Sequence, residues 1–185
     1  SGKTTLLNMI GGLDQPSDGE ILVDHTNLAE LKSSRLIDFR MRKIGFVFQS
    51  YNLIPVLTAK ENVEFIMSLQ KWGKKERDER TLELLKAVGL EDRINSRPSK
   101  LSGGQQQRVA VARALASKPK FVLADEPTAN LDSKSTETLL DIMEELNRDE
   151  GITFIFSTHD ARVVKKARRV ITLEDGKVIS DERKK

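Results

Sequence analysis

The sequence predicts an α/β fold with a mostly parallel sheet and an inserted helical lobe. Strand-like and helix-like segments alternate after Pro98, and the strand-like segments are uniformly apolar, as in Phe121–Ala124. Such strands are buried on both faces, which is typical of parallel pairing with helices on either side. The segment between Gln49 and Pro98, in contrast, is nearly all helical by its residue spacing.

The size and composition of the chain limit its organisation. Its 185 residues fit one domain, for which we expect an α/β core of residues 1–49 and 99–185 and a helical lobe of about residues 50–98. No stretch approaches the roughly 20 apolar residues that span a bilayer. The absence of cysteine excludes disulfides and thiolate metal sites. Aromatic residues make up only 5% of the chain, and its basic and acidic residues are intermixed, with a net charge of +3 and no long run of one sign. Because a groove that binds nucleic acid combines basic with aromatic residues, we expect none here.

Local signals place the individual elements in chain order. Leu82, Leu85 and Val88 can share one helical face, and Gly89 is typical of a residue that ends a helix. Asp175-Gly176 is a turn signal between two strands. The expected elements are a loop entering a helix at 1–10, strands at 20–24 and 44–48, helices at 58–69, 75–88 and 103–116, a strand at 121–124, a helix at 133–147, a strand at 152–157, a short helix near 161, and strands at 170–173 and 177–179.

The first five residues, Ser1-Gly2-Lys3-Thr4-Thr5, match the second half of the phosphate-binding pattern G-x-x-x-x-G-K-[ST]. Glycine lets the backbone approach a phosphate closely, and the following helix directs its free N–H groups and positive dipole end at the anion. In this pattern Lys3 reaches the β- and γ-phosphates, and the Thr4 hydroxyl binds Mg²⁺. Because Gly-Lys-Thr also occurs by chance, this motif alone leaves a nucleotide site and an ordinary helix start both open.

A second motif follows the apolar strand at 121–124, which ends in Asp125-Glu126. Ligands of open α/β sheets bind beyond the carboxyl ends of the strands. Asp125 can hold Mg²⁺, directly or through water, and Glu126 can act as the general base that polarises an attacking water. In isolation, an ordinary strand followed by an acidic helix cap explains the pair equally well, but Lys3 and Thr4 upstream weaken that alternative.

A third motif, Leu101-Ser102-Gly103-Gly104-Gln105, opens a helix. Ser102 is a good N-cap, and the two glycines leave the N–H groups of the first turn accessible, which makes a second anion-binding helix end. Two such ends are unexpected if both serve one nucleotide within one chain. A chance match of this motif about 20 residues before a carboxylate-ended strand is very improbable.

With this motif the chain resembles the ABC ATPases, whose signature sequence is Leu-Ser-Gly-Gly-Gln and whose fold is that of the P-loop NTPases. The resemblance covers essentially the whole chain. It implies ATP and Mg²⁺ as cofactors and a homodimer of two ATP-binding subunits joined head to tail. In such a dimer the signature of one subunit caps the γ-phosphate bound by the other. The signature argues against a non-ABC P-loop kinase.

Three further positions match the family. Gln49 matches the glutamine that touches Mg²⁺ and the attacking water, Asp132 an aspartate that works across the dimer interface, and His159 the histidine that contacts the γ-phosphate. Taken alone, they fit a polar strand end, a helix N-cap and a structural histidine. The resemblance implies catalytic roles for Glu126, His159 and Gln49; nucleotide contacts for Ser1, Gly2, Lys3, Thr4, Thr5, Ser102, Gly103, Gly104, Gln105 and Asp132; and Mg²⁺ ligation by Thr4, Gln49 and Asp125.

Three longer stretches are similar to the lipoprotein-releasing and macrolide-exporting group: 8–14, 44–56 and 158–181. The resemblance implies a peripheral subunit on the cytoplasmic face of the inner membrane, which powers export or the release of lipoproteins or peptides through integral permease subunits. Two alternatives stay open, an ABC ATPase acting on nucleic acid or ribosomes and a cell-division ABC pair that signals across the membrane. The nucleic-acid versions carry coiled-coil, zinc or second-cassette elements, none of which the sequence displays.

The family pattern begins several residues before Ser1. A leading strand, the first half of the phosphate loop and an aromatic residue that stacks on adenine precede it, and Tyr51 and Trp72 lie in the wrong region to replace that aromatic. We therefore expect the sequence to be a fragment of a longer protein whose first strands are missing. Taken alone, it is expected to bind ATP poorly and to expose unpaired strand edges.

Overall fold

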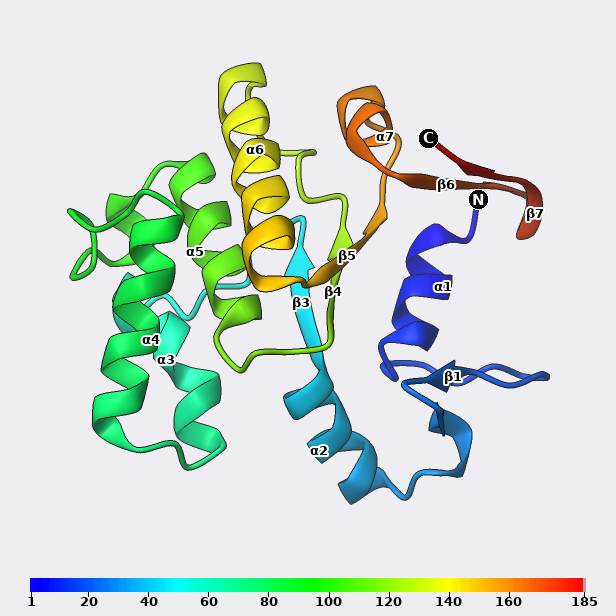
Figure 1. Ribbon diagram of the computed structural model, residues 1–185, viewed down its shortest axis with the longest axis horizontal. Coiled ribbons are helices and arrows are strands. Elements are labelled where there is room, and N and C mark those ends of the chain that lie inside the picture. Colours follow the sequence, from blue (N-terminus) through cyan, green and yellow to red (C-terminus); the bar gives the residue numbers. More distant parts are fainter. Residues whose placement is uncertain (185) are drawn as a thin grey trace.

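A three-stranded parallel sheet forms the centre of the computed structural model, which describes residues 1–184 (Figure 1). Its strands lie in the order β3 (Ile44–Phe48), β4 (Phe121–Asp125) and β5 (Thr153–Ser157). The pairing of β3 and β5 with β4 is parallel, as the apolar strands predicted. Phe48, Asp125 and Ser157 are register partners, so all three strands end at the same edge of the sheet.

Two hydrophobic clusters cover the two faces of this sheet. On one face Leu123 packs with Leu7 of α1 (Lys3–Ile10). On the other, Val122 packs with residues of α5 (Gly103–Leu115) and α6 (Ser133–Glu150). Successive side chains of a strand point to opposite faces, so a strand that is apolar at every position is buried on both. Figure 1 accordingly shows α1 to the right of the sheet, and α5 and α6 to its left.

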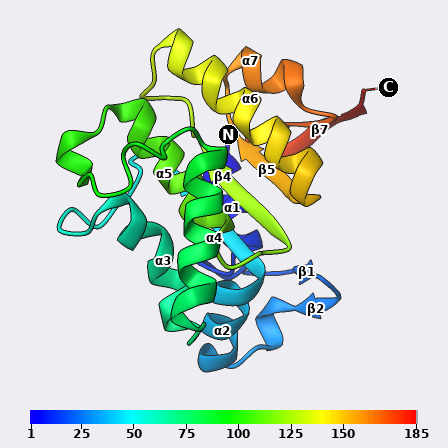
Figure 2. The ribbon, with the colours of Figure 1, turned by 60° about the vertical axis from the view of Figure 1, so that its left-hand side comes forward.

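The helical segment consists of α3 (Ala59–Leu69) and α4 (Lys74–Ala87), which pack together against α5. Figure 2 shows these helices in front of the sheet and α1 behind it. Thr58 caps α3 with a reciprocal capping box to Glu61. Gly89 follows α4 with a φ of 66°, the left-handed conformation in which glycine ends helices. Helix α5 therefore lies between the helical segment and the sheet and contacts both.

The remaining elements are peripheral. The strand expected at 20–24 is shorter, because β1 (Leu22–Val23) turns back at Asp24-His25, where both φ angles are positive, to pair with β2 (Thr26–Asn27). The strands expected at 170–173 and 177–179 form an antiparallel hairpin. Also present are the 3₁₀ turns Leu28–Glu30 and Pro98–Lys100, helices α2 (Ser33–Lys43) and α7 (Ala161–Lys166), and strands β6 (Arg169–Glu174) and β7 (Lys177–Arg183).

Helix α2 was not expected from the sequence. None of its residues is fully buried, and its half-buried face mixes Leu36 and Phe39 with the charged Arg40 and Lys43, so no purely apolar stripe marks it in the sequence. Its stabilising features are charges: Arg42 pairs with Asp38 one turn earlier, and Arg40, Arg42 and Lys43 lie in the last turn, where cations favour the helix dipole.

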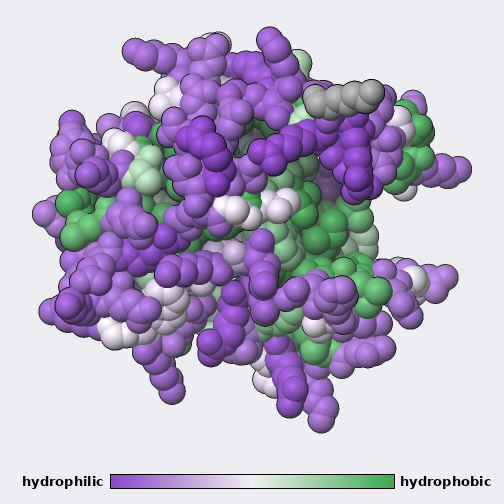
Figure 3. All heavy atoms as spheres, in the orientation of Figure 1, coloured by the Kyte–Doolittle hydropathy of each residue, from purple (hydrophilic) through white to green (hydrophobic). Residues whose placement is uncertain are grey.

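The visible face in Figure 3 is mostly hydrophilic, with hydrophobic surface gathered over α1. Leu6 of α1 and Leu13 just after it are among the exposed apolar side chains. Within residues 1–184, none of the helices combines the length and apolar character needed to cross a bilayer.

Gly45→Ala is expected to lower the free energy of unfolding by about 1–3 kcal/mol. A Cβ at Gly45 would lie 2.4 Å from the Ala114 carbonyl oxygen of α5 and 3.0 Å from Val122 Cγ2, so α5 would have to move away from the sheet. Urea unfolding measures the change. The control is Gly73→Ser, where a Cβ meets nothing within 4 Å and serine is a favoured N-cap of α4. Equal stability of the two variants would contradict this close approach of α5 to β3.

Candidate functional site

Functional side chains gather at the carboxyl edge of the sheet. Since β3, β4 and β5 end in register, the residues that follow them emerge side by side: Gln49 after β3, Glu126 after β4, and His159 shortly after β5. A backbone hydrogen bond of 2.8 Å from the Glu126 N–H to the Ser157 carbonyl fixes two of these loops to one another. The edge of the sheet therefore supplies an acid, an imidazole and an amide in one place.

The N-terminus of α1 approaches the same edge. Gly2 precedes the helix with a φ of 85°, a backbone conformation that favours glycine. Its first turn contains no acidic residue that would oppose an anion. The Thr4 hydroxyl donates a 3.1 Å hydrogen bond to Asp125 Oδ1, although the two residues are 121 positions apart. The Lys3 ammonium donates to the Ser1 hydroxyl at 2.9 Å. A cation, a hydroxyl and a carboxylate thus adjoin the free N–H groups of a helix start.

Glu126 and His159 contact each other directly. His159 Nδ1 lies 2.8 Å from Glu126 Oε1; the carboxylate is largely covered, with 18% of the side chain exposed, whereas the imidazole is 80% exposed. Glu126 also has a φ of 46°, in the left-handed region that costs a non-glycine residue about 1–2 kcal/mol. This backbone turns its side chain away from the line of β4 and toward the imidazole.

Gln49 is held by a residue that the sequence did not single out. Its side-chain amide donates to Asn130 Oδ1 at 3.4 Å, and Asn130 Nδ2 donates back to the Gln49 carbonyl at 3.1 Å. The Gln49 side chain is therefore hydrogen-bonded to Asn130, and not to Thr4 or Asp125, which bond to each other. Because the partners are 81 positions apart, no local pattern indicates the pair.

The signature residues form a separate part of the site. Ser102 and Gln105 make a reciprocal capping box at the start of α5. A Cβ at Gly104 would lie 2.9 Å from Ser135 Oγ, so the starts of α5 and α6 touch. Asp132 caps α6, and its hydrogen bonds from Ser135 lower the pKa of that carboxyl. A cavity of about 160 Å³ opens between the two helix starts, lined by Ser102, Gly104, Arg108, Lys134, Ser135 and Thr138.

The structure does not bring the signature residues to the phosphate loop of the same chain. Helix α1 and helix α5 lie on opposite sides of the sheet (Figure 1). Ser102 and Gly104 line the cavity beside α6, whereas Lys3 and Thr4 stand by the edge formed by β4 and β5. Each molecule therefore presents two separate helix N-termini, those of α1 and α5.

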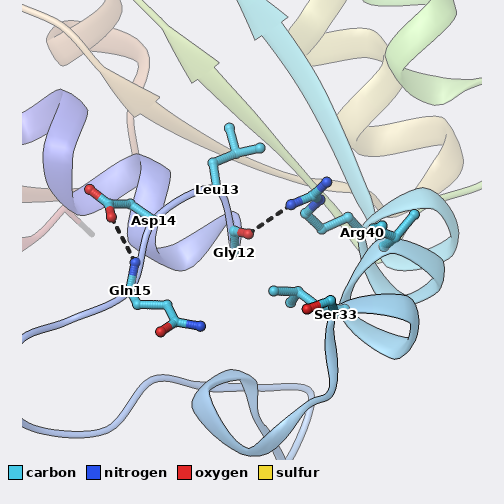
Figure 4. Close-up of a pocket in the computed structure, with 8 residues that line it drawn as sticks. Gly12, Leu13, Asp14, Gln15, Ser33 and Arg40 are labelled. Carbon is cyan, nitrogen blue, oxygen red and sulfur yellow. Dashed lines mark hydrogen bonds between the residues drawn. The ribbon is translucent and has the colours of Figure 1, made fainter.

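A second, larger cavity is lined neither by the start of α1 nor by the start of α5. Its volume is about 280 Å³, and it opens between the segment after α1 and helix α2 (Figure 4). Arg40 donates to the Gly12 carbonyl at 2.9 Å across it, and Asp14 accepts from the Gln15 N–H at 2.9 Å. None of the expected site residues lines this cavity.

Asp160, next to His159, joins the loops after β4 and β5. It caps α7 by accepting from the Arg162 N–H, receives two further hydrogen bonds from the Arg162 guanidinium, and accepts from Thr128 Oγ1 at 2.9 Å. These bonds, those from the Arg162 side chain above all, hold the pKa of Asp160 far below its usual range despite its burial. Sequence reasoning missed this group, since Thr128 and Asp160 are 32 positions apart.

Asp160→Asn is expected to lower the free energy of unfolding by about 1–3 kcal/mol at neutral pH, the usual contribution of a hydrogen bond to a charged group. Because the pKa of the folded state is depressed, the carboxylate stabilises the fold above the ordinary Asp pKa of about 3.9, and that stabilisation is lost as the pH falls toward the folded pKa. Urea unfolding from pH 8 downward should give a constant difference to about pH 5 and a shrinking one below. A difference that persists unchanged at the lowest pH would contradict an ionised Asp160.

The protein groups at the sheet edge fit a magnesium ion better than a metal with several protein ligands. Among residues 1–184, no cluster of three or more His, Cys, Asp or Glu side chains is placed to hold a metal. Thr4 Oγ1 and Asp125 Oδ1 are nevertheless adjacent oxygens, at 3.1 Å. Mg²⁺ prefers oxygen ligands and is usually bound by one or two protein groups together with substrate phosphates and water. The pair therefore fits Mg²⁺ that arrives with a nucleotide.

Known proteins are similar to this chain in both sequence and fold. The "ABC transporter" family model matches residues 1–129. The uncharacterized ABC transporter ATP-binding protein YvrO of Bacillus subtilis is 51% identical over 99% of this chain and 80% of its own length. The lipoprotein-releasing system ATP-binding protein LolD of Syntrophotalea carbinolica is 43% identical over 96% of this chain and 78% of its own length.

Solved structures of the ATP-binding cassette MJ0796, from Methanocaldococcus jannaschii, agree with this fold. Its dimeric post-hydrolysis structure with ADP and Pi has a TM-score of 0.88 and 46% identity, covering 98% of this chain and 80% of the cassette. Another dimeric structure of MJ0796 has a TM-score of 0.89 and 47% identity over the same shares of both chains. The chain therefore belongs to the ABC transporter family, as one of its ATP-binding and ATP-hydrolysing subunits.

Proposed function

We propose that this chain binds Mg-ATP at the carboxyl edge of its sheet and hydrolyses it in a head-to-tail homodimer. The observation that carries this proposal is the adjacency of two pairs at one edge. Thr4 and Asp125 are joined at 3.1 Å, and Glu126 and His159 at 2.8 Å. Neither pair is local in sequence, yet the four side chains together supply what phosphoryl transfer requires, positioned oxygens beside a base.

The start of α1 would hold the phosphates. The backbone of Ser1 and Gly2 and the N–H groups of the first helical turn approach the phosphate oxygens, Lys3 reaches the β- and γ-phosphates, and Thr5 adds a hydroxyl and a backbone N–H. Thr4, Asp125 and Gln49 would hold Mg²⁺, directly or through water. When bound, the ion would supply positive charge that offsets the negative charge of the phosphates.

Glu126 would act as the general base. Its carboxylate would orient the attacking water and accept a proton from it as the bond from the water oxygen to the γ-phosphorus forms. The bond from that phosphorus to the β–γ bridging oxygen breaks, and ADP leaves. His159 is exposed enough to reach the γ-phosphate while staying beside Glu126. Gln49, on the neighbouring strand end, would orient the same water. The contribution of all three is positioning and electrostatic stabilisation rather than covalent chemistry.

The second subunit would complete each site. Since the signature residues of one chain lie across the sheet from its own phosphate loop, they would cap the γ-phosphate held by the partner. The N–H groups of Gly103 and Gly104 and the side chains of Ser102 and Gln105 would make this contact at the first turn of α5, and Asp132 would act across the same interface. The dimeric cassettes with TM-scores of 0.88 and 0.89 support this arrangement.

The output would be transport through membrane partners. We assign residues 1–49 and 99–185 to a catalytic core and about 50–98 to a helical lobe, which with the Gln49 region would contact integral permease subunits. The chain would then work as a peripheral subunit on the cytoplasmic face of the inner membrane. The 43% identity to a lipoprotein-releasing ATP-binding protein supports export or the release of a lipoprotein or peptide as the driven process.

ATP hydrolysis by the purified full-length protein tests this proposal. Phosphate release should require Mg²⁺, stop on addition of EDTA, and fall by about 10²- to 10³-fold in Lys3→Ala, which lacks the cation on the transferred group. Lys74→Ala, at the start of α4 far from the sheet edge, is the control. Turnover that is independent of Mg²⁺, or equal in Lys3→Ala and Lys74→Ala, would overturn the proposal.

A further inference from the structure

The segment around Gln49 is attached to the signature helix. Two side chains of α5 bind its backbone on both sides of Gln49. Gln107 Nε2 donates to the Phe48 carbonyl at 3.3 Å, and the Arg113 guanidinium donates to the Tyr51 carbonyl at 2.8 Å and to the Asn52 carbonyl at 2.5 Å. Gln49 is therefore enclosed between two anchoring points that lie on a single helix.

A third contact reaches the N-terminal end of α5. A Cβ at Gly103 would lie 2.8 Å from the Tyr51 hydroxyl, so the Tyr51 side chain lies against the signature glycines. The same residue thus contacts the signature through its side chain and Arg113 through its carbonyl. The segment 48–52, which leads from the sheet to the helical lobe, is therefore held against α5 by these contacts.

The backbone of this segment needs such support. Tyr51 and Asn52 have φ angles of 60° and 51°, both left-handed and both on non-glycine residues. Each costs about 1–2 kcal/mol, and such conformations persist only where neighbouring groups hold them. The Arg113 fork binds the carbonyls of these two residues, so it stabilises the conformation where the strain is located.

The hydrogen bonds of both anchoring side chains go to backbone carbonyls. Gln107 is fully buried, and its amide also donates to the Pro127 carbonyl at 2.6 Å, next to Glu126. Arg113 forms no ion pair within residues 1–184, and partial burial lowers the pKa of its guanidinium. A partly buried, always-charged fork without an acidic partner gives up part of its hydration, so its use on two backbone carbonyls points to a positioning role.

We propose that Arg113 and Gln107 are positioning residues that fix Gln49 relative to the signature motif, so that α5 links the nucleotide site of one chain to the signature it presents to the other. This inference rests on the proposed ATPase dimer. In that dimer Gln49 senses the attacking water of its own site, and Ser102–Gln105 face the partner's γ-phosphate. A displacement of segment 48–52 then moves α5, and a displacement of α5 moves Gln49.

Arg113→Lys tests the fork while keeping the charge. A lysine cannot bind both carbonyls in a planar fork, so Gln49 should lose its fixed position. Turnover should fall by about 10- to 100-fold, the effect of a misplacement near 1 Å, while the affinity for ATP stays within twofold because the phosphate loop is untouched. The matched control is Arg77→Lys on α4, where the guanidinium of Arg77 donates a comparable hydrogen bond to the carbonyl of Trp72, just before that helix.

A double-mutant cycle with Gln49→Ala separates positioning from general stability. If Arg113 acts through Gln49, Arg113→Lys should lower turnover by no more than twofold in the Gln49→Ala background. Gln107→Met, which keeps the volume but removes both amide bonds, should behave in the same way. Unchanged turnover in both variants, or losses that multiply fully with that of Gln49→Ala, would overturn the inference. A wild-type protein without Mg²⁺-dependent hydrolysis would instead refute the proposed function itself.

Discussion

Glu126→Gln is expected to lower the rate of ATP hydrolysis by about 10²- to 10⁴-fold, the usual contribution of a general base. The amide occupies the same volume and keeps the same left-handed backbone, so the fold changes little. It can still contact His159 but cannot accept a proton from water. Lys3, Thr4 and Asp125 are unaltered, so ATP binding should persist.

Two measurements on the same preparation check this expectation. Phosphate release should nearly vanish, and light scattering should detect a dimer with ATP that does not re-form with ADP, because the variant closes around a nucleotide it cannot cleave. The matched control is Glu76→Gln, an exposed residue of α4 whose side chain makes no hydrogen bond within residues 1–184. Unchanged turnover in Glu126→Gln would remove Glu126 as the base.

The elements that the sequence predicted well are those defined by local patterns. The strand at 44–48 and the helix that begins after Thr58 match the structure, since apolar runs and capping residues act within a few positions. The strand before Asp125-Glu126 extends by only one residue beyond its expected end. Helix α2 was missed because its half-buried face mixes the apolar Leu36 and Phe39 with the charged Arg40 and Lys43.

The residues of the site also differ in how far local patterns predicted them. Thr4 and Asp125 could be predicted as partners only because each belongs to a recognisable motif, and the structure then joins them at 3.1 Å. Asn130 lies in the stretch 129–132 that matched the family through Asp132, but neither Asn130 nor Arg113 carries a local signal of its contacts. Both bind the segment after β3 from elements 61 or more positions away, and such pairs depend on how the sheet and α5 pack in three dimensions.

Gly104→Asp separates nucleotide binding from hydrolysis more sharply than a change in the phosphate loop. A Cβ at this position would lie 2.9 Å from Ser135 Oγ and 3.0 Å from Ser135 Cβ, so Ser135 must shift to admit the side chain, whose carboxylate would occupy the cavity between α5 and α6. There a carboxylate would repel the partner's γ-phosphate. Turnover should fall by about 10²- to 10³-fold, as when a preorganised charge-stabilising contact is lost.

ATP binding should survive in this variant, because the signature lies across the sheet from the phosphate loop of its own chain. Equilibrium titration with a fluorescent ATP analogue should give a dissociation constant within twofold of the wild type, whereas the ATP-dependent dimer should be lost. Gly73→Asp is the control, a glycine at the start of α4 where a Cβ meets nothing within 4 Å and aspartate is a favoured N-cap. Loss of binding together with turnover in Gly104→Asp would mean that the signature serves the nucleotide of its own chain, and the head-to-tail dimer would then be wrong.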